Sequence, residues 1–133
     1  MYCIILTNTY IFASSSIKRI KMINIENNKA QMRKGVLELC ILAVLAEGDA
    51  YPSEIIARLK ETKLLIVEGT LYPLLTRLKN DGVLSYRWEE SSSGPPRKYY
   101  KLTEEGNAFL KELNTSWQEL VETVSKTTKN INS

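Results

Sequence analysis

Residues 68–84, EGTLYPLLTRLKNDGVL, decide the fold of this chain. Four leucines in this stretch have the spacing i, i+3, i+4, i+7 of one helix face: Leu71, Leu74, Leu75 and Leu78. This pattern predicts an amphipathic helix over residues 68–81, which an Asp-Gly pair should end. Because proline is tolerated only in the first turn of a helix, Pro73 places the expected start near Thr70, with Thr70 as the cap.

The face of this helix opposite the leucines predicts a contact with double-stranded DNA. It carries small, hydroxylic, amide or cationic side chains, namely Thr70, Tyr72, Pro73, Thr76, Arg77, Lys79 and Asn80. Arg77 could bind a guanine edge and Asn80 an adenine edge, while Tyr72, Thr76 and Lys79 suit phosphates. The alternative is an ordinary amphipathic helix whose polar face only meets solvent. We favour DNA because a hairpin with basic residues comes next in the chain.

A β-hairpin is predicted directly after this helix. Residues 83–90 and 97–103 have the composition of strands, and the loop SSSGPP at 91–96 consists of turn formers. Arg97 and Lys98 open the returning strand, where they could lie along the DNA backbone or in the minor groove. The alternative is an exposed hairpin whose charges only aid solubility.

Two helices are predicted before the deciding stretch. Apolar residues at three- and four-residue intervals indicate a buried helix over 29–47, and Pro52 suits the first turn of a second helix over 52–61. Cys40 lies in the apolar run of the first helix and is interpreted as a small buried hydrophobe. The segment 62–67 is expected to be either a short strand or a packed connection.

A last helix is predicted over 103–127, capped by Thr103 with two glutamates in its first turn. A seam with alternating intervals of three and four runs along it: Leu110, Leu113, Trp117, Leu120 and Val124. Such a seam is typical of helices that pair with another helix.

The expected organisation has three parts. Residues 1–28 form an N-terminal extension, 29–103 the DNA-binding domain, and 104–133 the C-terminal helix and tail. The apolar stretch near the start is too short to span a bilayer, and its basic residues follow it, unlike in a secretory signal. We expect translation to start at Met22, or residues 1–21 to be a disordered tail. The alternative is an interfacial anchor.

Composition argues against an enzyme and against a metal or cofactor site. The chain has no histidine, and its two cysteines, Cys3 and Cys40, form neither a disulfide framework nor a zinc site. A phosphate-binding glycine loop is also missing from the sequence. Reduced cytoplasm fits this cysteine usage. The net charge of +3 is too small to identify nucleic-acid binding, which must be argued from the placement of residues.

The order helix, helix, helix, strand, strand, helix predicts a mainly helical α+β fold: a winged helix-turn-helix with a two-stranded wing and a C-terminal dimerisation helix. From about Arg33 to Leu110 the sequence resembles the PadR-like transcriptional regulators. Three segments carry the resemblance: MRKGVLELCILAVLAEGDAYPSEI, EGTLYPLLTRLKNDGVL and SGPPRKYYKLTEEGNAFL. With a single C-terminal helix, the chain looks like the short subfamily.

The resemblance implies a homodimer joined through C-terminal helices and repression at a pseudo-palindromic operator, often relieved by a small molecule. It also implies that Tyr72 and Arg97 face DNA. Trp117 lies mid-seam, so two copies could hold a flat aromatic effector between them; the alternative is a packed interface residue. A different class of function, a protein-interaction adaptor that uses the wing and the last helix, stays open, and the salt dependence of binding would separate the two.

Overall fold

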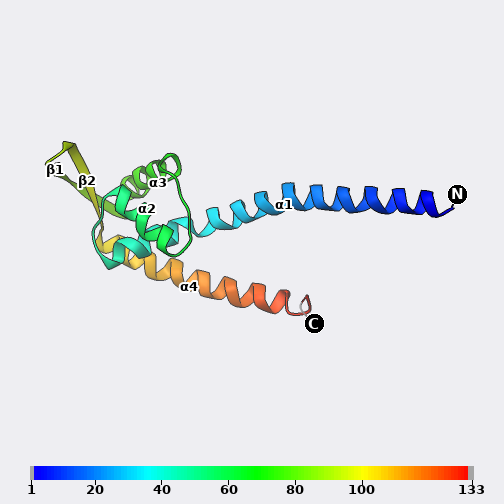
Figure 1. The fold of residues 1–133 in the computed structure, drawn as a ribbon. Coiled ribbons are helices and arrows are strands. Elements are labelled where there is room, and N and C mark those ends of the chain that lie inside the picture. The colour runs from blue at the N-terminus through cyan, green and yellow to red at the C-terminus, as the bar shows by residue number, and fades with distance from the viewer. Residues whose placement is uncertain (1, 132–133) are drawn as a thin grey trace. The chain divides into compact units, whose positions relative to one another are not determined.

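In the computed structural model, the backbone is described for residues 2–131 and the side chains for residues 25–131. Four helices and one two-stranded antiparallel sheet follow one another along the chain (Figure 1): α1 (Tyr2–Glu47), α2 (Pro52–Glu61), α3 (Glu68–Asn80), β1 (Leu84–Ser91), β2 (Gly94–Leu102) and α4 (Glu104–Thr127). This confirms the predicted mainly helical winged fold with a single C-terminal helix.

The chain divides into two compact units, residues 1–36 and 37–133. Helix α1 begins at Tyr2 rather than at residue 29, so the predicted start of this helix was wrong. The physical reason is that no proline or glycine interrupts the chain before Gly35. The side chains of residues 1–24, including Cys3, lie outside the described part, and the start-site and anchor hypotheses stay predictions.

The hydrophobic core lies in the second unit. Six side chains are fully buried there: Ile41, Leu42, Ile55, Leu71, Leu75 and Leu78. The leucine stripe that predicted α3 therefore faces the core, with Leu74 partly buried beside it. Cys40 is half-buried and packs against the same core, and burial raises the pKa of its thiol. Residues 37–47 of α1 thus form one helical body together with α2 and α3.

The connection before α3 contains no strand. Lys63 turns the chain with a positive φ of 65°, and Ile66 is buried as the anchor of residues 64–67. The interpretation as a packed connection is confirmed. Helix α3 begins at Glu68 with Val67 as its N-cap, so Thr70 is not the cap that we expected. The backbone N–H of Thr70 donates to the Val67 carbonyl across 3.0 Å, so Thr70 already lies inside the first turn.

The hairpin is longer and its turn shorter than predicted. Only Ser92 and Ser93 lie between the strands, because β2 already begins at Gly94 and includes both prolines. In a two-stranded sheet both strands are edges, so a proline without an N–H can occupy a position that faces away from the partner strand. The expected six-residue loop at 91–96 was therefore wrong.

The start of α4 is attached to the base of the hairpin. Thr103 caps the helix as predicted, since its Oγ1 accepts from the Gly106 N–H at 2.9 Å. The same hydroxyl donates to the Gly82 carbonyl at 2.6 Å, just after α3 ends. Gly106 is buried at this joint, and glycine is needed there because a Cβ would overlap the carbonyl oxygen of Val83. The chain thereby joins α3, β1 and α4 at one point.

Candidate nucleic-acid interface

The polar face of α3 is exposed as a whole. All seven side chains that the sequence singled out on this helix are accessible: Thr70, Tyr72, Pro73, Thr76, Arg77, Lys79 and Asn80. The opposite face buries three leucines, so the helix is held firmly by one side and free on the other. A helix in this situation can enter a major groove without disturbing the core.

Arg77 already has a partner within the protein. Its Nη2 donates to Glu38 Oε2 of α1 across 2.8 Å, and Nη1 lies 3.9 Å from Asp81 Oδ2. The hydrogen bond to Glu38 is the main cause that raises the pKa of the guanidinium, and the negative charge of the same carboxylate is the second cause. Contact with a base would require Arg77 to leave this carboxylate or to share its donors. Sequence reasoning missed Glu38, because its separation from Arg77 in the chain carries no periodic signal.

Two other members of the α3 face have contacts that limit their freedom. The Thr76 hydroxyl donates to the Tyr72 carbonyl at 3.0 Å, one turn earlier in the helix. Burial is the main cause that raises the pKa of the Tyr100 phenol. The nearby phenols of Tyr86 and then Tyr72 raise this pKa further. Tyr72 therefore lies toward the hairpin, as Lys79 also does.

Arg97 and Lys98 do not share a face of the hairpin. In the register of the sheet Lys98 is opposite Trp88, and Arg97 is opposite Glu89. Successive residues of a strand point to opposite sides, so these two cations are separated by the sheet itself. Only one of them can lie on the side that continues the surface of α3.

Lys98 is the cation on the α3 side. Its Nζ lies 4.6 Å from the ring centre of Tyr86 and 5.5 Å from that of Trp88. Lys79 of α3 approaches the other side of this cluster, with Nζ 5.8 Å from the Tyr86 ring. We call these four residues, Lys79, Tyr86, Trp88 and Lys98, the wing strip.

Arg97 belongs to a stack on the opposite face. Its guanidinium lies 4.1 Å from the Tyr51 ring, which is 4.7 Å from the Tyr99 ring. The guanidinium of Arg87 lies 4.3 Å from the centre of the Tyr99 ring. Arg87 also binds Glu89 at 2.7 Å and Asp49 at 3.3 Å. The sequence identified Arg97 but missed these partners, although the alternation of strand residues could have placed Arg87 and Tyr99 together.

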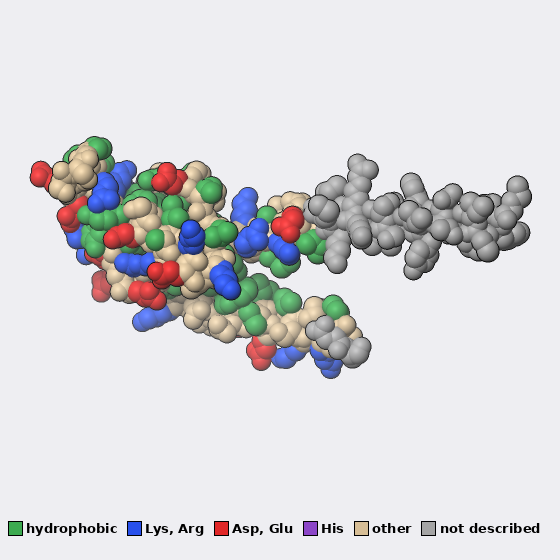
Figure 2. All heavy atoms as spheres, viewed as in Figure 1, with side chains coloured by type: hydrophobic (Ala, Val, Ile, Leu, Met, Phe, Trp, Pro, Cys, Tyr) green, Lys and Arg blue, Asp and Glu red, His purple; other side chains and the backbone are tan. Residues whose placement is uncertain are grey.

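Charge alone does not distinguish one side of the molecule in the view of Figure 2. Figure 2 shows lysine and arginine interspersed with aspartate and glutamate over the helices and the hairpin. Among the described residues no group of acidic, histidine or cysteine side chains could hold a metal ion. Nor does any helix in that part of the chain have the length and apolar character needed to cross a membrane.

The seam predicted on α4 divides into two parts. Leu110 and Leu113 are partly buried against the core of their own chain. The other three members, Trp117, Leu120 and Val124, stay exposed, with Leu120 at 53% and Trp117 at 37%. Two further apolar side chains, Phe109 and Val121, extend this surface. We call Phe109, Trp117, Leu120, Val121 and Val124 the α4 stripe.

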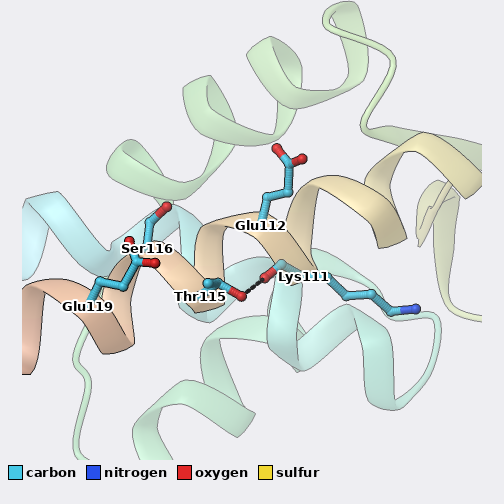
Figure 3. A pocket seen from close by; sticks show the side chains of 5 residues that line it. All are labelled: Lys111, Glu112, Thr115, Ser116 and Glu119. Atoms are coloured by element: carbon cyan, nitrogen blue, oxygen red, sulfur yellow. Dashed lines mark hydrogen bonds between the residues drawn. The ribbon is translucent and has the colours of Figure 1, made fainter.

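A shallow hollow of about 340 Å³ lies along a neighbouring side of α4 (Figure 3). The described residues that line it are polar: Lys111, Glu112, Thr115, Ser116 and Glu119. The Thr115 hydroxyl donates to the Lys111 carbonyl at 3.1 Å within the helix. Trp117 is not among these lining residues, so the hollow is separate from the effector site that the sequence predicted.

Comparison with known proteins identifies the family. Residues 41–112 match the model of the transcriptional regulator PadR-like family. A PadR-like transcription factor from Bacteroides fragilis is 63% identical, with 76% of this chain and 98% of that chain covered and a TM-score of 0.65. PadR-type regulators from Bacillus cereus and Eggerthella lenta are 36% and 31% identical.

The last two structures also cover most of the chain. The Bacillus cereus protein covers 75% of this chain and 98% of its own, with a TM-score of 0.67. The Eggerthella lenta protein covers 90% and 98%, with a TM-score of 0.75. Members of this family are transcription regulators and not enzymes. The chain belongs to the PadR-like family of transcriptional regulators.

Proposed function

We propose that the protein is a dimeric repressor that binds a pseudo-palindromic operator in the cytoplasm. One observation carries the proposal: α3 buries its leucines and exposes an entire polar face, and the hairpin after it continues that face with Lys98 and two aromatic rings, next to Lys79 of α3. A recognition helix needs this division between a core face and a groove face.

The proposed DNA contacts follow from where each side chain lies. Thr70, Tyr72 and Pro73 form the N-terminal part of the α3 face, and Asn80 is the amide suited to an adenine edge. Lys79 and Lys98 suit phosphates on the side of the wing strip, and Arg97 suits phosphates from the opposite face of the hairpin. Arg77 binds a guanine edge only in competition with Glu38.

The proposed dimer is formed through α4. The α4 stripe exposes five large apolar side chains on one helix, more than a solvated helix face needs. A second copy of the same helix is the occupant that the three- and four-residue spacing favours, because self-complementary seams pair by two-fold symmetry. Trp117 lies in the middle of the stripe, where two copies could hold a planar aromatic effector that releases the operator.

The experiment that tests this function is a fluorescence-anisotropy titration of labelled DNA from upstream of the gene, at two salt concentrations and with excess competitor DNA. Counterion release predicts specific binding that weakens steeply with salt. Asn80→Ala should weaken binding to this DNA, while Asn114→Ala, at an exposed position of α4, serves as the matched surface control.

The alternative is a protein-interaction adaptor, and the same titration distinguishes it from a DNA-binding repressor. This alternative places a partner protein on the wing and on α4, where Trp88 and the α4 stripe are exposed. The affinity for an apolar partner protein bound there would not fall steeply with salt. Failure to bind upstream or genomic DNA at low salt would favour this alternative over the repressor.

A further inference from the structure

Trp88 is the large aromatic side chain that the wing leaves open to solvent, with 61% of its surface exposed. It lies on the strand face that buries Leu84 and Tyr100 at the base of the hairpin and continues outward toward the turn. Tyr86 lies between Trp88 and α3, so the indole is on the α3 side of the wing. Neither the core nor the α4 stripe accounts for an indole at this position.

Trp88 is packed on one side by Tyr86 and Lys98, which restrict its rotation. The Tyr86 ring meets the indole edge-on at 84° with 5.9 Å between ring centres, and Tyr86 in turn contacts Tyr100, which is buried. Lys98 lies directly across the strand pair and places its ammonium 5.5 Å from the indole. A ring fixed in this way loses little side-chain entropy when it binds, which favours its use as an anchor.

The charge beside Trp88 indicates the chemistry of its partner. Two ammonium groups, Lys98 and Lys79, flank the aromatic pair of the wing strip. Glu89 is turned to the other face of the sheet, where Arg87 binds it at 2.7 Å. An aromatic ring beside two cations matches a polyanion with flat apolar groups, namely the sugars and base edges of DNA between phosphates.

We infer that Trp88 is a DNA contact of the wing, and that its indole packs against the deoxyribose and base edges of the minor groove next to the major groove that α3 occupies. Lys98 binds the adjacent phosphate and Tyr86 supports the indole from behind. This inference rests on the proposed function, because it requires α3 to be the recognition helix. Trp88 then sets where along the operator the wing lies, independently of base recognition by Asn80.

Intrinsic fluorescence tests the contact directly, because the chain has only two tryptophans. In the Trp117→Phe protein, Trp88 is the sole indole. Its emission should be quenched as upstream DNA is added and should level off at the stoichiometry found by anisotropy. The Trp88→Phe protein, which reports on Trp117 alone, identifies any change that does not come from the wing.

Affinity measurements give the second readout. Trp88→Ala should weaken binding to upstream DNA about tenfold, the usual cost of removing an aromatic anchor, and Trp88→Phe should recover most of it. The dependence on salt should be unchanged in both proteins, whereas Lys98→Ala should lower the slope of log K against log salt by about one. Ile131→Ala removes an exposed apolar side chain from the tail and is the matched control.

The outcomes separate this inference from the proposed function. If the wild-type protein binds in a salt-dependent manner, but Trp88→Ala binds equally well and Trp88 emission does not change, the inference is overturned and the repressor stands. If Trp88→Ala instead changes the oligomeric mass, a second copy and not DNA occupies the indole, and the inference is again overturned. If no upstream or genomic DNA binds the wild-type protein, both fail.

Discussion

The guanidinium of Arg77 donates to the carboxylate of Glu38 across 2.8 Å, which ties α3 to α1 on the edge of the proposed groove face. Half of the Arg77 side chain is nevertheless exposed, so solvent screens the pair and its contribution to folding is below about 1 kcal/mol. The pair therefore matters more for what Arg77 can bind than for stability.

Glu38→Gln should raise the affinity for random DNA about threefold to tenfold, because it frees Arg77 and removes one negative charge beside the groove face. Thermal unfolding should change little. Glu112→Gln, an exposed carboxylate on α4, controls for the loss of charge alone. A fall in affinity would mean that Glu38 instead holds Arg77 in the orientation that binds DNA.

Arg77→Ala should weaken binding to upstream DNA by about 1–3 kcal/mol if the side chain contacts a guanine edge, with the lower end expected because the bond to Glu38 must be broken first. Competition titrations on upstream and random DNA measure the difference. Lys79→Ala should lower both affinities equally. An equal loss for Arg77→Ala on both DNAs would make Arg77 a phosphate contact.

Gly106→Ala should lower the free energy of unfolding by about 1–3 kcal/mol, since the new Cβ would overlap the backbone oxygen of Val83 and force α4 away from β1. Chemical denaturation monitored by circular dichroism measures this. Gly35→Ala is the matched control, as nothing lies within 4 Å of its added Cβ and alanine favours the helix. Equal stability of the two variants would contradict the tight joint at Gly106.

Leu120→Glu should convert the proposed dimer to a monomer without unfolding the chain, because Leu120 is 53% exposed and contributes nothing to the core. Light scattering after size exclusion measures the mass, and circular dichroism checks the fold. Leu113→Glu is a poorer test, since Leu113 packs against its own core and the variant would also destabilise the monomer. A Leu120→Glu protein that stays dimeric would place the interface elsewhere.

Local patterns were enough to predict most of the elements. Helix α2 has the predicted bounds, α4 begins at the predicted Thr103 cap, and the leucines of α3 face the core. Each of these depends on periodicity or on end residues within a few positions, which is why a single sequence contains them. The start of α1 could not be predicted in this way, because a long helix without breakers has no end signal.

The sequence by itself determined the order of elements, the buried face of α3 and the family motifs, all of which depend on neighbours in the chain. Tertiary structure alone decided the pairing of Arg77 with Glu38, the separation of Arg97 from Lys98 and the position of Trp88 beside Lys98. These depend on strand register and on the contact of α3 with α1. Register and helix contacts are set by side chains that meet only after the core has closed.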